Sequence, residues 1–186
     1  IEKKVFENAI APDLPASGQL PNEKFIKAYE AQAFKSEGTR KEITEKYAAE
    51  QGLDPALIAA FATKESGMGT NNRCAYAGKS ILTGCGWPPS CADGCKCSGR
   101  SVFSDEGQLK CTANTLRNAY EQASGNQQGV YSKCAGKFDG ETDKWKCILC
   151  VYQSGTAGTD CNYQASVFSI FKQWKKYYED KEKRSS

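Results

Sequence analysis

The chain has 186 residues, enough for one domain with a buried core. Its 25 Lys and Arg outnumber its 22 Asp and Glu by three, and so small an excess gives no reason to expect nucleic acid as a partner. The sequence contains no His, which excludes Ser-His and Cys-His nucleophilic catalysis and most catalytic zinc sites. No apolar run approaches the roughly 20 residues that a membrane-spanning helix needs.

Three helices are predicted in the first third of the chain. Residues 21–35 carry apolar side chains at three- and four-residue spacing, which is typical of an amphipathic helix. Thr39 and Glu42 are spaced as a capping box at the start of a second helix, which runs to about residue 51. An acidic cap followed by proline opens a third helix over 54–66, and a glycine ends it.

The middle of the chain has a different character. Residues 70–105 show no periodicity and are rich in Cys, Gly, Pro and Ser, which predicts an irregular segment. Helical patterns resume over about 112–124 and 163–179, and between them Thr142 or Asp143 is expected to cap another helix that ends near residue 154. The sum is a mainly helical domain with a long irregular insertion.

The ten cysteines fall into two groups, six over 74–111 and four over 134–161. An even number at irregular spacing is typical of disulfides formed in an oxidising compartment. A structural zinc site is the alternative, because three cysteines cluster over 91–97 and Cys147 and Cys150 form a CxxC. Zinc modules usually show two matched CxxC pairs and this chain has one, so we expect five disulfides and no metal. Cys147 and Cys150 stand three apart on one helix and are expected to pair with other cysteines.

Glu65 stands out among the ionisable residues. It lies four residues after Phe61 and seven after Ile58, on the apolar stripe of its helix. It also lies in the last turn, where the helix dipole disfavours a negative charge. Both effects raise a carboxyl pKa and favour an acid that is still protonated near neutral pH, as a general acid for glycosidic cleavage must be. The alternative is a carboxylate at the edge of the stripe that bends into solvent.

Residues 52–67, GLDPALIAAFATKESG, resemble the first motif of the soluble lytic transglycosylases, which are lysozyme-like enzymes that cleave peptidoglycan. In that family a helix of the form D-P-x-L-[IV]-x-A-[IV] ends in E-S-G, and its Glu is the catalytic acid. The resemblance implies that Glu65 is this acid and that Ser66 helps to hold the site.

Two further motifs follow in the order of that family. The Gly-Gln-Leu sequence around Gln108 resembles a segment whose Gln lines the substrate cleft, although no G-L-M precedes it and Cys111 stands where Pro is usual. Residues 151–158, VYQSGTAG, resemble A-Y-N-A-G-P-G, whose Tyr sits close to the catalytic acid. The resemblance implies that place for Tyr152 and a substrate-binding position for Gln153, which replaces the usual Asn.

The activity implied is cleavage of the β-1,4 bond between N-acetylmuramic acid and N-acetylglucosamine, with 1,6-anhydro-N-acetylmuramic acid ends. Glu65 would act alone, first protonating the glycosidic oxygen and then taking a proton from the 6-hydroxyl of the sugar, with no metal or cofactor. A hydrolytic muramidase is the alternative and would need a second carboxylate to activate water. Asp93, Asp105 and Glu106 are the candidates, although Asp105 and Glu106 are surface charges by default.

A more remote alternative is a disulfide-rich module that binds glycan without catalysis, through loop aromatic residues such as Trp87 and Tyr76. In either case the expected partner is the glycan strand of peptidoglycan, with no nucleic acid and no membrane span, and the protein is expected to be a monomer. Its cysteine content favours a secreted, periplasmic or cell-surface location.

The expected fold class is mainly α. A lysozyme-like helical catalytic domain over 39–180 carries the disulfide-rich irregular insertion. Residues 1–38 form an N-terminal extension, a loop and one helix that packs on the domain. Residues 181–186 are a charged tail that is expected to fray.

Overall fold

The computed structural model describes residues 8–70, 75–76, 79–80, 82, 95–97, 100–102 and 104–185. It is mainly helical, as the sequence predicted. The helices are α1 (Glu23–Glu30), α2 (Arg40–Gln51), α3 (Pro55–Ser66), α4 (Asp105–Ala123), the 3₁₀ turn η3 (Val130–Cys134), α5 (Glu141–Ser154) and α6 (Asn162–Ser185). The insertion carries two short antiparallel hairpins, β1 (Ala75–Tyr76) with β2 (Lys79–Ser80) and β3 (Cys95–Cys97) with β4 (Arg100–Val102).

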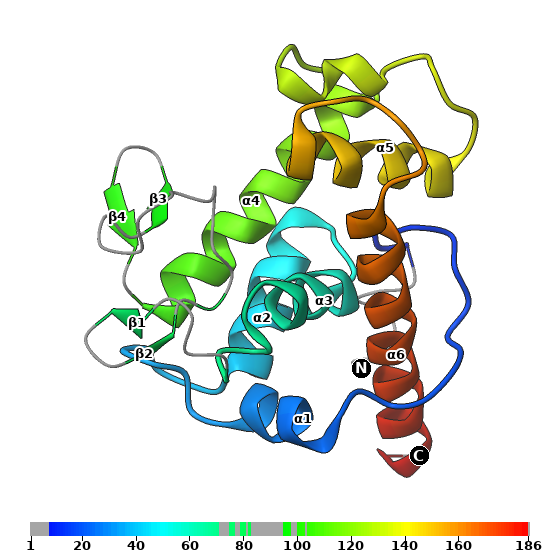
Figure 1. The fold of residues 1–186 in the computed structure, drawn as a ribbon. Helices are drawn as coiled ribbons and strands as arrows, with labels where there is room; N and C mark the ends of the chain where they lie inside the picture. The colour runs from blue at the N-terminus through cyan, green and yellow to red at the C-terminus, as the bar shows by residue number, and fades with distance from the viewer. Residues whose placement is uncertain are drawn as a thin grey trace.

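Helix α3 lies at the centre of the molecule, between α2, α4 and α6 (Figure 1). Every residue from Pro55 to Thr63 is buried, as is Ser66. A helix that is apolar all round must be covered on all sides, because exposing any face would leave apolar surface in water. The sequence pattern indicated only one apolar face of α3, since the short side chains Ala59 and Ala60 do not mark a second one by themselves.

The predicted boundaries of α2 and α3 are confirmed. The Thr39 hydroxyl accepts the Glu42 N–H at 3.1 Å, and the Glu42 carboxylate accepts the Thr39 N–H at 2.8 Å, which completes the capping box. The Asp54 carboxylate caps α3 by accepting an N–H from its first turn at 2.9 Å. Gly52 and Gly67 end the two helices with φ of 65° and 58°, a region that glycine enters without steric cost.

Two helices have different lengths from those predicted. α1 stops early because Ala31 is extended and the following chain forms an antiparallel bridge, Gln32 with Thr39. α4 begins seven residues before the predicted start at 112. The Ser104 hydroxyl accepts the Gly107 N–H at 3.0 Å and caps the helix there. Residues 106–111, which the sequence assigned neither to the irregular segment nor to the helix, therefore belong to α4.

The last two helices also differ from the prediction. Thr142 and Asp143, the two predicted caps, lie inside the first turn of α5. α6 continues through most of 181–186, which was expected to fray, and an ion pair of 2.8 Å between Lys181 and Glu30 ties this end to α1. Within the residues that the structure describes, none of the helices is both long enough and apolar enough to cross a membrane.

The N-terminal segment packs on the helices that follow it. Tyr29 in α1 is fully buried, and its ring meets Trp174 of α6 edge-on with 4.7 Å between centroids. Ile10 forms a parallel bridge with Leu53, just ahead of α3. Between these contacts the chain runs along the outer side of α6 (blue in Figure 1).

Two disulfides lie in the C-terminal third of the chain. Cys134–Cys147 ties η3 to α5, and Cys150–Cys161 ties α5 to the residue before α6. The prediction that Cys147 and Cys150 pair with other cysteines is confirmed, and this CxxC is not a zinc site. The side chains of the five cysteines over 74–97 lie outside the described residues, so the total of five disulfides stays a prediction.

Helix α6 packs along α3, and one buried hydrogen bond joins the two. Trp174 is fully buried, and its Nε1 donates to the Thr63 hydroxyl oxygen at 2.8 Å. The same hydroxyl donates to the Ala59 carbonyl at 2.8 Å, so both of its roles are satisfied. A buried indole N–H without an acceptor would carry its full desolvation penalty.

We therefore expect Thr63→Val, which keeps the side-chain shape, to lower the free energy of unfolding by about 1–3 kcal/mol because the Trp174 N–H loses its acceptor. Urea denaturation measures the change. Thr156→Val, at an exposed position, is the matched control and should change stability by less than about 0.5 kcal/mol. Equal stability of the two variants would show that this hydrogen bond is unimportant.

Candidate active site

Glu65 lies in the last turn of α3 and is half-buried. Its Oε1 accepts a hydrogen bond from the hydroxyl of Tyr163, in the first turn of α6. Burial raises the pKa of the Glu65 carboxyl, and the Tyr163 hydrogen bond and the Lys64 charge oppose this rise without cancelling it. The direction is the one that the sequence predicted, whereas the tyrosine partner was not predicted.

Aromatic rings from three helices meet beside this carboxyl. Tyr163 of α6 stacks on Tyr152 of α5, with 5.6 Å between centroids and 28° between ring planes. Phe61, one turn before Glu65 on α3, meets the two rings edge-on, at 5.5 Å from Tyr152 and 6.4 Å from Tyr163. Tyr152 therefore lies on the same side of the domain as Glu65, with Tyr163 making the direct contact.

Tyr163 keeps its own proton beside Glu65 and donates it in the hydrogen bond. Burial and the neighbouring Glu65 carboxylate raise the pKa of its hydroxyl far above the ordinary value for tyrosine, so it keeps its proton across the pH range in which proteins function. The sequence did carry a signal for this residue. Tyr163 lies four positions before Val167 and extends the apolar stripe of the last helix by one turn.

Ser66 and Gln108 hold the same short piece of backbone from two sides. The Ser66 hydroxyl donates to the Leu82 carbonyl, and the Leu82 N–H donates to Oε1 of Gln108 at 2.6 Å. Ser66 Oγ also accepts the Gly69 N–H at 2.8 Å. Leu82 is fully buried, so this pair of bonds anchors the insertion to the ends of α3 and α4.

These contacts bear on the roles that the resemblance implied. Ser66 lies next to Glu65, and its bonds to Leu82 and Gly69 fix the chain after α3. Gln108 was expected to line a substrate cleft, but it is only 3% exposed and its side-chain oxygen is engaged by Leu82. It supports the insertion from inside. Gln153 is exposed in the last turn of α5, directly after Tyr152.

Asp105 is not the surface charge that the sequence indicated. It is 1% exposed, and its Oδ2 lies 2.9 Å from Arg40 Nε. The same oxygen accepts the Phe34 N–H at 2.7 Å, and the Asp105 N–H donates to the Phe34 carbonyl at 3.0 Å. Asp105 thus joins the start of α4 to the chain before α2.

Glu106 also faces α2. Its Oε1 accepts the Tyr47 hydroxyl at 2.8 Å and lies 3.7 Å from the Lys46 amine. Two of the three candidates for a second carboxylate, Asp105 and Glu106, are therefore engaged with α2 and the chain before it. The third candidate, Asp93, lies outside the described residues. In the part of the chain that the structure describes, no group of three or more His, Cys, Asp or Glu side chains could hold a metal ion.

Comparisons with known proteins found no match for this chain, whether among family models, curated proteins or solved structures. Any functional conclusion therefore depends on the geometry and chemistry of the site and on the motifs in the sequence.

The buried ion pair gives a stability prediction. Asp105→Asn removes the charge opposite Arg40, and we expect it to lower the free energy of unfolding by about 3 kcal/mol because a largely buried cation is left unpaired. Glu106→Gln is the control, with a partly exposed carboxylate and an expected cost below about 1 kcal/mol. Chemical denaturation of both variants gives the values, and a smaller loss for Asp105→Asn than for Glu106→Gln would contradict the structural role of Asp105.

The raised pKa of Glu65 gives a second prediction, on stability against pH. The folded protein binds the Glu65 proton more tightly than the unfolded chain does, so wild-type stability falls as pH rises from about 4.5 through the folded pKa. Glu65→Gln has no charge to bury and escapes this loss. We expect the two proteins to differ least in melting temperature below pH 4.5, and the advantage of Glu65→Gln to grow with pH and then level off. A pH-independent difference would show that Glu65 is not held in an environment that disfavours its charge.

Proposed function

We propose that this protein cleaves the glycosidic bond between N-acetylmuramic acid and N-acetylglucosamine in peptidoglycan, with Glu65 as the general acid. The observation that carries the proposal is the half-buried Glu65 carboxyl, whose pKa burial raises and whose Oε1 is held by a tyrosine hydroxyl. A carboxylic acid that keeps its proton near neutral pH can protonate a glycosidic oxygen, which is the first requirement of this reaction.

The motifs support the same assignment. Residues 52–67 and 151–158, which resemble two motifs of the soluble lytic transglycosylases, supply Glu65 and Tyr152, and the rings of Phe61, Tyr152 and Tyr163 connect the two segments. A lysozyme-like arrangement of the helices around α3 is part of the proposal. So are a location outside the cytoplasm, with which the two disulfides are compatible, and a monomeric state.

The hydrogen bond from Tyr163 assigns different tasks to the two carboxyl oxygens. Oε1 accepts the tyrosine hydroxyl, so Oε2 is the oxygen that carries the transferable proton. That proton goes to the glycosidic oxygen as the bond to the sugar C1 breaks and an oxocarbenium-like centre forms. The carboxylate left on Glu65 then takes the proton of the 6-hydroxyl, and this oxygen closes the anhydro ring onto C1. Tyr163 keeps its own proton in both steps and holds the carboxyl in place.

The contacts of Asp105 and Glu106 favour this route over hydrolysis. An inverting hydrolase needs a second carboxylate across the sugar ring, about 6.5–9.5 Å from the first, to activate water. Asp105 is buried in its pair with Arg40, and Glu106 bonds Tyr47. Attack by the 6-hydroxyl needs no such group, because the nucleophile belongs to the substrate and is already positioned.

The test is digestion of purified peptidoglycan followed by mass spectrometry of the fragments. We expect ends of 1,6-anhydro-N-acetylmuramic acid, lighter than hydrolysed ends by one water. Glu65→Gln should slow cleavage by about 10²–10⁴-fold, because the amide can neither give the proton nor take it back. Glu50→Gln, at an exposed position on α2, is the matched control and should cleave at the wild-type rate.

Other outcomes identify other functions. Reducing ends alone, with loss of activity in Glu106→Gln or in folded Asp105→Asn, would make the protein a hydrolytic muramidase. Binding of peptidoglycan without any cleavage would favour a non-catalytic glycan-binding module. Near-normal cleavage by Glu65→Gln would show that another group is the acid.

A further inference from the structure

We propose that the Cys150–Cys161 disulfide is a positioning element for Glu65. It holds Tyr163 against the Glu65 carboxyl, and the site is therefore assembled only after this disulfide has formed. The effect of this disulfide on catalysis rests on the proposed function, whereas its effect on the position of Tyr163 does not. The contacts around the junction of α5 and α6 support each step.

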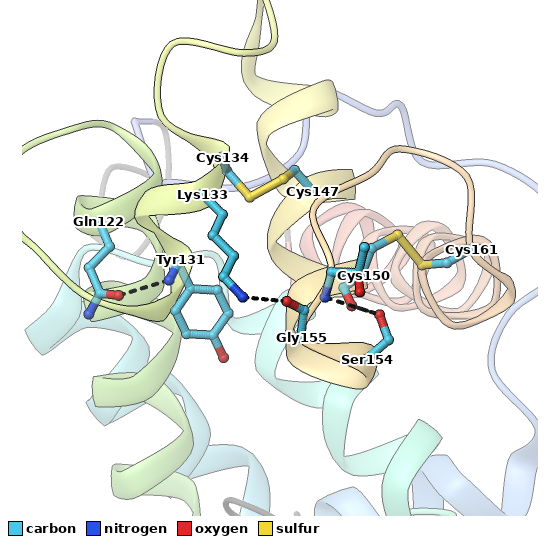
Figure 2. The surroundings of a disulfide bond; sticks show 10 residues. Gln122, Tyr131, Lys133, Cys134, Cys147, Cys150, Ser154, Gly155 and Cys161 are labelled. Carbon is cyan, nitrogen blue, oxygen red and sulfur yellow. Dashed lines mark hydrogen bonds between the residues drawn. A yellow bond between two sulfur atoms is a disulfide. The ribbon is translucent and has the colours of Figure 1, made fainter.

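The disulfide lies beside the two tyrosines in the sequence and joins the helices that carry them. Cys150 precedes Tyr152 by two residues on α5, and Cys161 precedes Tyr163 by two residues at the start of α6. Figure 2 shows this bond crossing from the end of α5 to the segment that enters α6. The stacked rings and the bond to Glu65 therefore depend on the same junction.

The two helices differ in how firmly they are held near the junction. The end of α5 is fixed several times: Lys133 Nζ donates to the Gly155 carbonyl at 2.6 Å, and the Ser154 hydroxyl donates to the Cys150 carbonyl at 2.9 Å (Figure 2). The Cys134–Cys147 disulfide holds α5 one turn earlier. These contacts restrain Tyr152 whether or not Cys150 is paired.

The first turn of α6 has a weaker hold on its own. The first N–H groups of any helix lack partners within that helix, so the first turn frays most easily. Gln164 is the buried residue of this first turn, and its side-chain oxygen accepts no hydrogen bond within the described residues, whereas the buried apolar side chains of α6 begin at Val167. Cys161 is the residue directly before the helix, and its disulfide restrains this turn from the N-terminal side. Without it, Tyr163 is expected to leave Glu65 for part of the time.

The two disulfides also differ in access. Cys134 and Cys147 are both buried, whereas Cys161 is half-exposed. A thiolate must reach a sulfur atom to open a disulfide, so a small dithiol should reduce Cys150–Cys161 first. Reduction takes two electrons and two protons from the dithiol, which closes into a cyclic disulfide, and leaves two thiols on the protein. In a reducing compartment the site would thus stay unassembled.

The experiment compares Cys150→Ala/Cys161→Ala with Cys134→Ala/Cys147→Ala. The two disulfides close loops of similar length, with sequence separations of 11 and 13, so their loss should destabilise the folded state by similar amounts. The first readouts need no substrate. In the Cys150→Ala/Cys161→Ala variant we expect nuclear Overhauser contacts between the Tyr152 and Tyr163 rings to weaken, and amide exchange at residues 165 and 166 to become about tenfold faster. In Cys134→Ala/Cys147→Ala, the control variant, the ring contacts and the amide exchange rates should stay near their wild-type values.

The second readout is a double-mutant cycle on the cleavage rate. Tyr163→Phe keeps the ring and removes the hydroxyl. We expect loss of Cys150–Cys161 to lower kcat on the order of tenfold to a hundredfold in the wild-type background, because small misplacements of a catalytic group are costly. In the Tyr163→Phe background the further loss should be less than about twofold, since the two changes remove the same interaction. Loss of Cys134–Cys147 should have the same effect in both backgrounds.

The failure of this proposal can be told apart from failure of the proposed function. If wild-type protein does not cleave peptidoglycan, the proposed function fails, and the ring contacts and amide exchange still test the positioning. Unchanged contacts and exchange in folded Cys150→Ala/Cys161→Ala would overturn the positioning role. If this variant does not fold, wild-type protein is titrated with dithiothreitol and its thiols are alkylated and mapped. Persistence of the Tyr152–Tyr163 contacts after Cys150–Cys161 has opened would then overturn it.

Discussion

The rest of the structure depends on the burial of α3. Its side chains from Pro55 to Thr63 are buried on every side, so the elements around it are positioned by the same apolar contact that stabilises the fold. Only the last turn reaches half-exposure, and Glu65 lies in that turn. The carboxyl is therefore attached to a helix that is buried along most of its length, and the desolvation that raises its pKa follows from that position. A site on a rigid element keeps its geometry better than one on a loop.

Local features of the fold could be predicted from the sequence because their causes are local. The capping box of Thr39 with Glu42 and the terminal glycines Gly52 and Gly67 satisfy or end a helix with residues close to it in the chain. The position of Glu65 on its stripe is also local. The error at the start of α4 has a local cause that could have been found, since Ser104 is a favoured cap. The apolar periodicity over 112–124 was a stronger signal than the cap at Ser104, and the helix was therefore predicted to begin at 112.

The groups that complete the site could not be predicted, because they come together across long stretches of chain. The Tyr163 hydroxyl meets Glu65 over a separation of 98 residues, and the Gln108 oxygen meets the Leu82 N–H over 26. The burial of Asp105 also depends on residues that are distant in the chain. Nothing in its neighbourhood in the sequence marks it as buried, and its burial is possible only because Arg40 and the Phe34 backbone compensate the charge. A motif can propose which residues matter, but only the packed structure shows that Gln108 faces inward.

The choice of tyrosine as the partner of Glu65 has an electrostatic consequence in a chain without His. A Lys or Arg in place of Tyr163 would favour the ionised carboxylate and lower the pKa of Glu65, which would remove the proton that a general acid has to give. A tyrosine hydroxyl orients the carboxyl through one hydrogen bond, and its own raised pKa prevents it from exchanging roles with Glu65. Burial also raises the pKa of Tyr131, which lies near Tyr163. Neither tyrosine hydroxyl therefore changes charge near neutral pH, so under the proposed function the proton that is transferred at this junction is the one on Glu65.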